Sequence, residues 1–372
     1  MRVIVVGGGV LGTLHARAAL AAGYEVIQVE RDLLPSSASV RNFGLIWIGG
    51  RASGNELNVS LRTRELWEEI SREIPEMTFR ANGSLTLVRT NAELKVLEES
   101  LQKSDSTERQ WKILDKKETQ VLNPALKGDY LASLWSPLDA TVEPGKVLTE
   151  IRTHLLKNEN YTWRTNVEIV DLRSNDLGVI AQSRDGEEFA GDVAIVTPGA
   201  DHSTLFRDQL QSAPIRQVYL QMMSTEPFNE ILTTSVADAD SLRYYPAYDV
   251  PALSLLPVQH PVAAENHMQL LLVQRADGTL TIGDTHAYQQ PFDFKLNEEP
   301  YKHLHRVASE LIGKEIPPIA YRWSGVYSQR TDGAICDRRF ITPNIVVVTG
   351  PGGRGNTLAP AIAEQTIKEL IG

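Results

Sequence analysis

The first 30 residues constrain the fold of this chain more than any other part of its sequence. An apolar run, Val3–Val6, leads into the glycine-rich string Gly7-Gly-Gly-Val-Leu-Gly12. A strand covered on both faces of a parallel sheet is typically apolar throughout. A helix is expected from about Leu11 to Ala22 and a second strand over Glu25–Glu30. This order predicts a parallel βαβ unit at the head of a doubly wound α/β fold.

The spacing of the three glycines is typical of a loop that holds a dinucleotide. Gly7 allows a tight turn, Gly9 lets the backbone approach a pyrophosphate, and Gly12 lets the helix pack closely on the strand. The first amides of the helix, at Val10 and Leu11, face the pyrophosphate at the positive end of the helix dipole.

An acidic residue completes the pattern. Glu30 lies 18 residues after Gly12, at the end of the second strand, where a carboxylate accepts hydrogen bonds from ribose hydroxyls. The alternative is a glycine turn that binds no nucleotide, but the full order of strand, glycines, helix, strand and acid favours a dinucleotide site. Arg31, next to Glu30, is also expected to contact the cofactor, although Glu30 would repel a 2′-phosphate there.

Two more glycine-containing loops favour FAD over NAD. A buried strand over 192–196 ends in Thr-Pro-Gly-Ala, and another over 345–349 ends in Gly-Pro-Gly-Gly-Arg-Gly before a helix expected over 359–371. A second helix N-terminus suits the electron-rich edge of a reduced flavin. An NAD-binding domain has little use for such an element at the far end of the chain.

Composition excludes several classes of function. The chain has 372 residues, which suggests two domains, and its net charge of -10 argues against a nucleic-acid partner. No run of about 18 apolar residues occurs, so no membrane span is expected. Its one cysteine, Cys336, rules out an intrachain disulfide and a multi-thiolate metal site, and no metal is expected. The N-terminus lacks the features of a signal peptide, so the cytoplasm is the default location.

These features together resemble the D-amino-acid-oxidase superfamily of FAD-dependent amine oxidases, which includes glycine oxidase and sarcosine oxidase. The resemblance covers the whole chain. It also rests on the strings Ser36–Gly44, Asp139–Pro144, Thr197–Ala200, Trp323–Gly325 and Asp332-Gly333. Three short strings, Ser39–Gly44, Asn82–Leu85 and Gly283–Tyr288, resemble more narrowly a bacterial clade that has been proposed to oxidise aminophosphonates.

The resemblance implies two domains built from separated segments. A glutathione-reductase-like FAD-binding domain would comprise residues 1–80, 142–213 and 326–372. An α+β substrate domain with an antiparallel sheet would comprise 81–141 and 214–325. Alternating and apolar segments predict strands over 84–89 and 269–274, and helices over 93–103 and 304–312.

The resemblance also implies a set of FAD-binding residues. In relatives one loop runs along the isoalloxazine, and the matching residues here are Ser39, Arg41, Asn42, Phe43 and Gly44. The backbone of Val167 would touch adenine, unless Val167 is a plain core residue. The remaining contacts would come from Pro198, Gly199, Gly352, Gly353, Arg354, Gly355, Asn356 and Thr357. Cys336 could carry a thioether but is more typical of a buried small residue, so FAD is expected to be non-covalent.

The chemistry expected of the family needs no acid–base residue from the protein. The α-hydrogen of the neutral amine passes to the flavin as a hydride, while the protein orients the substrate and tunes the cofactor. No catalytic acid or base is therefore expected.

The most informative departure from the family lies at Tyr327. In glycine-oxidase-like relatives the segment is Trp-Ala-Gly-Leu-Arg-Pro, and its arginine grips the substrate carboxylate; here Tyr327 occupies that position. A phosphonate carries more charge and needs donors from several directions. The candidate substrate-binding residues are Tyr327, Arg330, His286, Tyr245, Tyr288 and Trp47, with Arg243 and Tyr244 nearby in sequence. Ordinary packing is the alternative for each aromatic residue, and His286 could instead be satisfied within the sheet.

The sequence therefore predicts an FAD-dependent oxidase of a primary or N-methylated aminoalkylphosphonate, releasing an aldehyde and hydrogen peroxide. Three alternatives stay open. The substrate could be an amino acid such as glycine or sarcosine, the electron acceptor could be a quinone or carrier protein instead of O2, or the protein could bind flavin without turnover.

Overall fold

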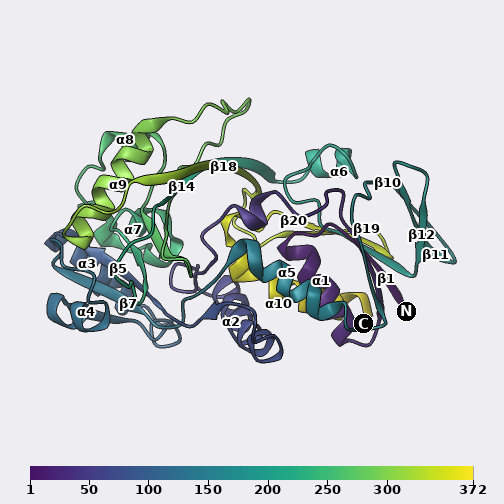
Figure 1. Cartoon of the computed structure of the whole chain (residues 1–372), viewed down its shortest axis with the longest axis horizontal. Coiled ribbons are helices and arrows are strands. Elements are labelled where there is room, and N and C mark those ends of the chain that lie inside the picture. The colour runs from purple at the N-terminus through teal and green to yellow at the C-terminus, as the bar shows by residue number, and fades with distance from the viewer. Residues whose placement is uncertain (372) are drawn as a thin grey trace.

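Two large sheets organise the molecule, seen in a computed structural model that describes residues 1–371 (Figure 1). The first sheet has six strands in the order β19-β20-β13-β1-β2-β9. Its parallel strands are β1 (Arg2–Val6), β2 (Glu25–Val29), β9 (Tyr161–Arg164), β13 (Val193–Val196) and β20 (Ile345–Thr349). The edge strand β19 (Asp337–Thr342) runs antiparallel to β20.

The six-stranded sheet is covered on both faces, which explains its apolar strands. Alternate residues such as Val3 and Val5 pack against helices, whereas Ile4 between them faces the other way. The helices are α1 (Val10–Ala21), α2 (Asn55–Glu73), α5 (Pro144–Leu155) and α10 (Gly355–Ile371). A three-stranded antiparallel sheet covers the opposite face: β10 (Ile169–Asn175), β11 (Gly178–Ser183) and β12 (Glu188–Gly191).

The second large sheet has eight strands in the order β18-β14-β17-β16-β15-β5-β7-β6. These are β5 (Ser84–Val88), β6 (Lys112–Asp115), β7 (Ala132–Ser136), β14 (Ile215–Thr225), β15 (Ser235–Ala237), β16 (Leu271–Gln274), β17 (Leu280–Gly283) and β18 (Ile319–Arg330). Helix α9 (Glu298–Ile312) packs on one face and α3 (Asn91–Leu101) on the other. The long strands β14 and β18 pair along their length and extend toward the six-stranded sheet (Figure 1).

Short elements complete the chain. A small sheet consists of β3 (Leu45–Ile46), β8 (Ala140–Val142) and β4 (Phe79–Arg80). The remaining α-helices are α4 (Lys116–Leu122), α6 (Arg207–Gln211), α7 (Ser241–Tyr244) and α8 (Pro261–Glu265). The 3-10 turns are η1 (Ala38–Val40), η2 (Pro246–Tyr248), η3 (Pro251–Leu255) and η4 (Gly352–Arg354).

The mixed α/β fold predicted from the sequence is confirmed, including the N-terminal βαβ unit. Gly23 follows α1 with φ at +83°, the left-handed conformation expected just beyond a helix. One strand pair departs from the antiparallel expectation, because β15 runs parallel to β5. The two-domain division stays a prediction, and we propose it with one qualification: β18 crosses its boundary at residue 326.

Helix starts were the least accurate part of the sequence prediction. Helix α10 begins at Gly355 and not at Ala359, and α9 begins at Glu298 and not at Leu304. The side chain of Asn297 caps α9 by accepting from the amide of Glu299.

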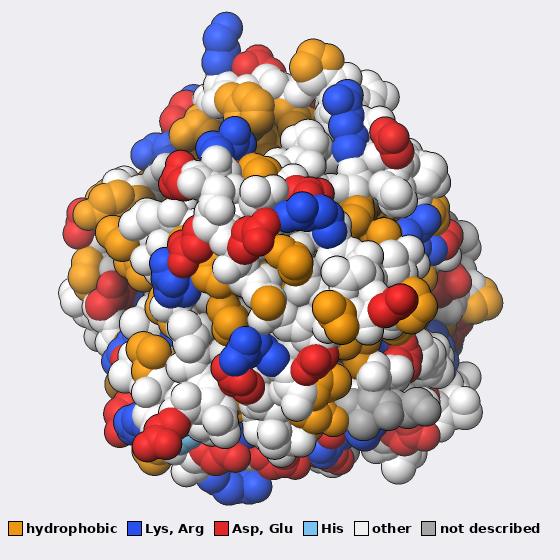
Figure 2. All heavy atoms as spheres, turned by 90° about the vertical axis from the view of Figure 1, so that its right-hand side faces the viewer, with side chains coloured by type: hydrophobic (Ala, Val, Ile, Leu, Met, Phe, Trp, Pro, Cys, Tyr) orange, Lys and Arg blue, Asp and Glu red, His pale blue; other side chains and the backbone are white. Residues whose placement is uncertain are grey.

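The outer surface of the β10–β12 side carries both signs of charge. In Figure 2, which looks onto the right-hand side of Figure 1, basic and acidic side chains alternate without a continuous patch of either sign. Within residues 1–371, no helix combines the length and the apolar character that crossing a membrane requires. In the same residues, no three His, Cys, Asp or Glu side chains are grouped so that they could hold a metal ion.

Candidate active site

The glycine loop after β1 is shaped for close approach of a ligand. A Cβ on Gly12 would lie 2.1 Å from the carbonyl oxygen of Gly7, so only glycine lets α1 pack there. A Cβ on Gly9 would lie 2.9 Å from Oγ of Ser39. This hydroxyl also accepts a hydrogen bond of 3.0 Å from the amide of Val10, which joins the glycine loop to the 36–44 segment.

Glu30 occupies the end of β2, where the sequence predicts it. One carboxylate oxygen accepts from the amide of Gly8 at 2.6 Å and the other from the amide of Asp32 at 3.1 Å. The carboxylate thus braces the glycine loop and keeps acceptor capacity for ribose hydroxyls. The side chain of Arg31 is turned to an ion pair with Asp201 at 2.8 Å.

A cavity of about 1370 Å³, the glycine-loop cavity, extends along these residues. The predicted cofactor residues that line it are Gly7, Gly9, Glu30, Arg31, Ser39, Arg41, Val167, Pro198 and Gly199. The amide of Val167 already donates to the carbonyl of Glu30 at 3.0 Å, which leaves its carbonyl for a ligand. The predicted adenine contact of Val167 stays a prediction.

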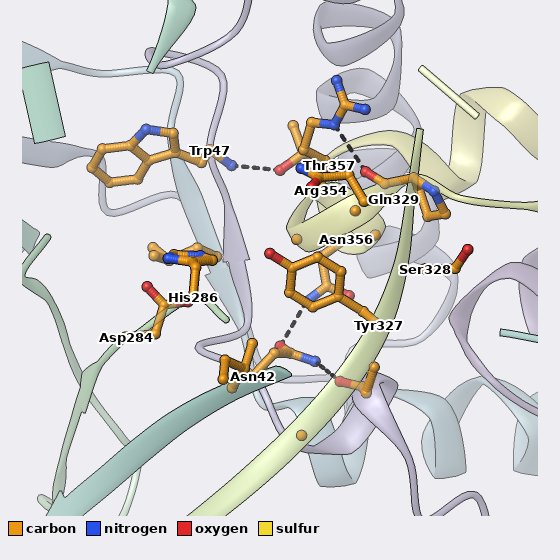
Figure 3. Close-up of a pocket in the computed structure, with 18 of the residues that line it drawn as sticks. Asn42, Trp47, Asp284, His286, Tyr327, Ser328, Gln329, Arg354, Asn356 and Thr357 are labelled. Atoms are coloured by element: carbon orange, nitrogen blue, oxygen red, sulfur yellow. Dashed lines mark hydrogen bonds and ion pairs between the residues drawn. The ribbon is translucent and has the colours of Figure 1, made fainter. Parts of the chain in front are cut away.

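The two segments assigned to the flavin ring lie against each other although about 310 residues separate them. Trp47 donates its amide to Oγ1 of Thr357 at 2.9 Å, and the side-chain amide of Asn356 donates to Oδ1 of Asn42 at 3.1 Å (Figure 3). Asn42 also donates to the carbonyls of Ala38 and Ser39. Asn42 therefore holds its own loop in shape and ties that loop to α10.

The arginines of these segments are used mainly to hold the backbone. Arg41 donates to the carbonyls of Ser36 and Ser324. Arg354 donates to the carbonyls of Pro351 and Ala334 and pairs with Glu56 at 3.2 Å. Both still line the second cavity described below.

Gly44 is the one predicted cofactor residue that lines neither cavity within the described chain. Its φ is +70°, and a Cβ there would lie 1.9 Å from the carbonyl oxygen of Val142. Gly44 is therefore needed for the packing of β3 on β8. Its predicted contact with the cofactor stays a prediction.

A second cavity of about 590 Å³, the aromatic cavity, opens between the eight-stranded sheet and the flavin segments. All six predicted substrate-binding residues line it: Trp47, Tyr245, His286, Tyr288, Tyr327 and Arg330. The remaining predicted cofactor residues line it too: Val10, Leu11, Gly12, Asn42, Phe43, Gly352, Gly353, Arg354, Gly355, Asn356 and Thr357. The two cavities share Gly9, Ser39, Arg41 and Gly199, so they form one continuous site.

The aromatic rings of this cavity form a connected wall. The ring centroids of Trp47 and Tyr245 are 5.6 Å apart, and those of Tyr245 and Tyr244 are 5.0 Å apart, edge to face. Tyr244 stacks on His286 at 4.7 Å. The guanidinium of Arg216 lies 3.9 Å from the centre of the Tyr288 ring. Such contacts hold rings in single orientations, which favours a preformed pocket.

Tyr327 points its hydroxyl to the side of the cavity where His286 and Asp284 lie (Figure 3). This buried hydroxyl has no hydrogen-bond partner among the described residues. Burial, together with the nearby Tyr244 and Asp284, holds the pKa of Tyr327 well above its ordinary value. Burial likewise raises the pKa of Tyr244. Both hydroxyls are therefore neutral donors at physiological pH.

Arg330 lines the cavity, but its guanidinium is already ion-paired with two carboxylates of the protein. Its guanidinium donates to Asp332 and Asp337. The hydrogen bond to Asp332 is the main reason that the pKa of Arg330 is raised. An anionic ligand would compete with two carboxylates for this side chain, which weakens the reason for assigning it to the substrate.

The polar residues of the cavity that the sequence prediction missed include Arg51, Arg216 and Asp284. Asp284 lies inside the string Gly283–Tyr288, two residues before the predicted His286. Arg51 follows Gly49 and Gly50, and a glycine pair beside an aromatic residue is the local signal that could have found it. Cys336 lines neither cavity, so the structure offers no thioether position at the site among the described residues.

The geometry fits a bound dinucleotide. A glycine cradle without room for side chains, a carboxylate at the end of β2 and two glycine loops joined by hydrogen bonds surround one continuous cavity. These residues would hold the pyrophosphate, the ribose and a redox ring, respectively.

Comparisons with known proteins give the family and the fold. The profile of a family described as FAD dependent oxidoreductase (DAO) matches residues 2–369. Similar solved structures include glycine oxidase from Geobacillus kaustophilus (19% identity, TM-score 0.79, covering 100% of this chain and 94% of that one). Glycine oxidase from Bacillus cereus ATCC 14579 has 15% identity and a TM-score of 0.81, covering 100% and 95%. L-α-Glycerophosphate oxidase from Mycoplasma pneumoniae with FAD bound has 16% identity and a TM-score of 0.75, covering 100% and 94%. A search of curated proteins found no match.

Proposed function

Because the chain belongs to the DAO family of FAD-dependent oxidoreductases, we propose that it oxidises the carbon–nitrogen bond of a small aminoalkylphosphonate. The amine is primary or N-methylated. Bound FAD supplies the chemistry by accepting a hydride from the carbon that bears the nitrogen. Water then hydrolyses the imine product to an aldehyde plus ammonia or methylamine, and O2 takes the electrons and leaves as hydrogen peroxide.

The charge of the aromatic cavity is the observation that carries this proposal. Six arginines line the cavity, and two of them, Arg243 and Arg330, pair with aspartates outside its lining. Four arginines remain against two acidic residues, Glu56 and Asp284. The protein as a whole carries a net charge of -10, so this excess of positive charge is local. A confined positive site in a negative protein favours a small anionic ligand.

Arg51 is the arginine best placed to bind that anion. It is 5% exposed, and its Nε has no partner among residues 1–371. Its closest carboxylate, that of Glu56, is 3.4 Å away, and Glu56 is shared with Arg354. The guanidinium lies 5.2 Å from the centre of the Tyr245 ring. A buried donor without a partner is costly, so a ligand oxygen there would be bound strongly.

The backbone around Arg51 is clamped from two sides, which preforms the anion site. Asp139 accepts from the amides of Ile48 and Gly49 at 2.5 and 2.8 Å. The buried guanidinium of Arg109 donates to the carbonyls of Gly49 and Arg51 at 3.1 and 2.7 Å. Preorganisation of this kind reduces the entropy lost on binding.

The remaining donors suit a tetrahedral anion better than a planar one. Trp47 has a buried indole N–H without a partner in the described chain, and the hydroxyl of Tyr327 is also unpartnered. A carboxylate is matched by one bidentate arginine, whereas three phosphonate oxygens need donors from several directions. Arg51 and Trp47 supply donors from the loop after β3, and Tyr327 supplies one from β18, which supports a phosphonate.

An amino-acid substrate is the second candidate. It is favoured by the glycine oxidases of similar fold, at identities of 19% and 15%. The tyrosine at position 327 counts against it, since the family's carboxylate-binding arginine is absent there. A dehydrogenase that passes electrons to a carrier is the third, and no side chain of the site distinguishes it.

Anaerobic bleaching of the flavin tests the proposal. The holoenzyme is mixed without oxygen with aminoalkylphosphonates, amino acids and simple alkylamines, and its visible absorption is followed. We expect aminoalkylphosphonates to bleach the flavin fastest, and peroxide to appear when O2 is admitted. Bleaching by amino acids alone would favour the second candidate, bleaching without peroxide the third, and no bleaching by any amine would refute amine oxidation.

A further inference from the structure

The aromatic cavity holds one carboxylate that none of its arginines pairs with. Asp284 follows β17 directly and is 7% exposed. One oxygen accepts from Nε2 of Gln269 at 3.2 Å, and the other lies 3.6 Å from Nε2 of His286. Within residues 1–371, His286 is its one ion-pair partner, and only when the imidazole is protonated. A buried carboxylate without a permanent cation is costly, so a bound cation would stabilise it.

The hydrogen bonds of His286 leave one nitrogen able to take up a proton. Nδ1 lies 2.8 Å from the carbonyl oxygen of His267, which can only accept, so Nδ1 carries a hydrogen. Nε2 lies 3.0 Å from the hydroxyl of Tyr244. In the neutral ring Nε2 accepts from that hydroxyl, and a proton added to Nε2 would face Asp284.

We propose that Asp284 binds the ammonium group of the substrate and accepts one of its protons before the carbon–nitrogen bond is oxidised. The inference rests on the proposed function, because it requires an amine as substrate. An alkylammonium has a pKa of about 10, so the substrate arrives protonated and without a free electron pair on nitrogen. In the step an N–H bond breaks, its electron pair stays on nitrogen, and an O–H bond forms on Asp284.

The surroundings of Asp284 suit this role. Burial is the main cause that raises the pKa of its carboxyl, and a protonated His286 would oppose that rise. A carboxyl whose pKa is shifted toward neutrality is a better base at physiological pH than an ordinary one. The titratable groups that face it are the hydroxyls of Tyr244, Tyr245, Tyr288 and Tyr327 and the imidazole of His286.

The cavity is thereby lined by two buried groups of opposite charge. Arg51 offers donors to the anion, and Asp284 offers an acceptor to the amine. The charges of both act on the hydroxyls of Tyr244 and Tyr245. A substrate with an anion at one end and an ammonium at the other is therefore held in one direction. This assignment departs from the expectation that no acid–base residue takes part.

The variant Asp284→Asn tests the inference, since it removes the charge and keeps an oxygen for Gln269. The rate constant of anaerobic flavin reduction is measured against pH with the amine that wild type oxidises. We expect the variant to lose about 100-fold near neutral pH, and its rate to rise about tenfold per pH unit until the substrate amine is deprotonated. Wild type should show a much flatter profile.

Binding supplies a readout that does not depend on turnover. Ligands are titrated into the oxidised holoenzyme and the flavin spectrum is followed. An aminoalkylphosphonate whose amine-bearing carbon carries no hydrogen, and which therefore cannot be oxidised, is compared with the alkylphosphonate that lacks the amine. Asp284→Asn should weaken the first ligand about tenfold and leave the second unchanged. Asp284→Glu keeps the charge and should retain much of the affinity. Asp176→Asn, at an exposed hairpin, is the matched control.

The outcomes separate this inference from the proposed function. If amines bleach wild type and Asp284→Asn keeps its pH profile and ligand affinities, the inference is overturned and amine oxidation stands. If no amine bleaches wild type, amine oxidation fails first. If Asp284→Asn does not fold, the test uses wild type alone. The pH dependence of its flavin reduction is compared between a substrate and the fluorinated analogue of that substrate, whose amine is less basic. If the fall of the reduction rate at low pH shifts with the pKa of the substrate amine, the inference is contradicted. If the rate falls at the same pH with both substrates, the inference is supported.

Discussion

At the scale of single residues, the cofactor-binding residues could be predicted from the sequence more directly than the substrate-binding residues. The glycines of the first loop and Glu30 were predicted from their spacing along the chain. The roles proposed for Arg51 and Asp284 rest on burial and on missing partners, which the spacing of residues in the sequence does not show.

Glu30 is the first residue whose role can be measured. Glu30→Ala should weaken FAD binding by about 1–3 kcal/mol, because ribose hydroxyls lose an acceptor and the amide of Gly8 loses its partner. Gly9→Val should abolish binding, since its side chain would enter the space of the pyrophosphate. Fluorescence of released FAD measures both. Glu25→Ala, on the same strand, is the control, and equal affinities in all variants would move the cofactor elsewhere.

Arg51 gives a second prediction at this scale. Arg51→Met should raise the KM of the anionic substrate about 10- to 100-fold with a smaller change in kcat, because it removes a charge-assisted hydrogen bond to a remote group. The KM of a simple alkylamine should not rise. Arg72→Met, at an exposed position of α2, is the control. An unchanged KM for the anion would leave Arg216 as the next candidate.

At the scale of elements, the segment 47–51 depends on a buried carboxyl. Burial raises the pKa of Asp139 from 3.8 to about 6, against the hydrogen bonds from Ser84, Gly49 and Ile48. A carboxyl whose pKa is higher in the folded than in the unfolded protein stabilises the fold at low pH. That contribution is lost as pH rises from about 4 through 6.

Asp139→Asn should remove this pH dependence, because an amide can still accept from the backbone and donate to Ser84. The unfolding free energy of the variant minus that of wild type should therefore increase by up to about 3 kcal/mol between pH 4 and pH 7. Denaturant titrations at several pH values measure it. Asp129→Asn, at an exposed position, should show no trend, and a flat difference for Asp139→Asn would refute the assignment.

The sequence predicted some elements of the fold accurately and misplaced the start of others. Strong periodicity and glycines predicted β1, α1, β2 and β20, whose apolar runs face both layers of the sheet. The start of α10 was missed because Gly355, Asn356 and Thr357 are residue types with low helix propensity. The structure places them in a helix whose first residues contact Trp47, Asn42 and Trp67, and such tertiary contacts override local preference.

At the scale of the whole molecule, the two cavities meet where the six-stranded and eight-stranded sheets approach each other. Every site residue that sequence and resemblance named, except Gly44, lines one of the two cavities, since motif positions carry over between relatives. They misjudged which arginine is free: Arg330 is held by Asp332 and Asp337, and those pairs depend on how β18 meets β19. Contacts between distant segments of this kind have no signature in local sequence.

The whole protein should be yellow, with FAD that acid or heat releases. The sole cysteine, Cys336, lies outside both cavities, and burial raises the pKa of its thiol, which disfavours the reactive thiolate. Denaturation followed by filtration and absorbance spectroscopy decides this. Flavin that stays with the precipitated chain would contradict non-covalent binding.

The choice between phosphonate and carboxylate tests the central claim most directly. The measurement is kcat/KM for matched pairs: aminomethylphosphonate with glycine, and 2-aminoethylphosphonate with β-alanine. Donors placed for one anion stay partly unpaired with another, and discrimination of this kind can reach about 10⁴-fold. The account predicts that the better phosphonate exceeds its carboxylate partner at least about 100-fold. Glycine or sarcosine as the best substrate of the unmodified enzyme would contradict it.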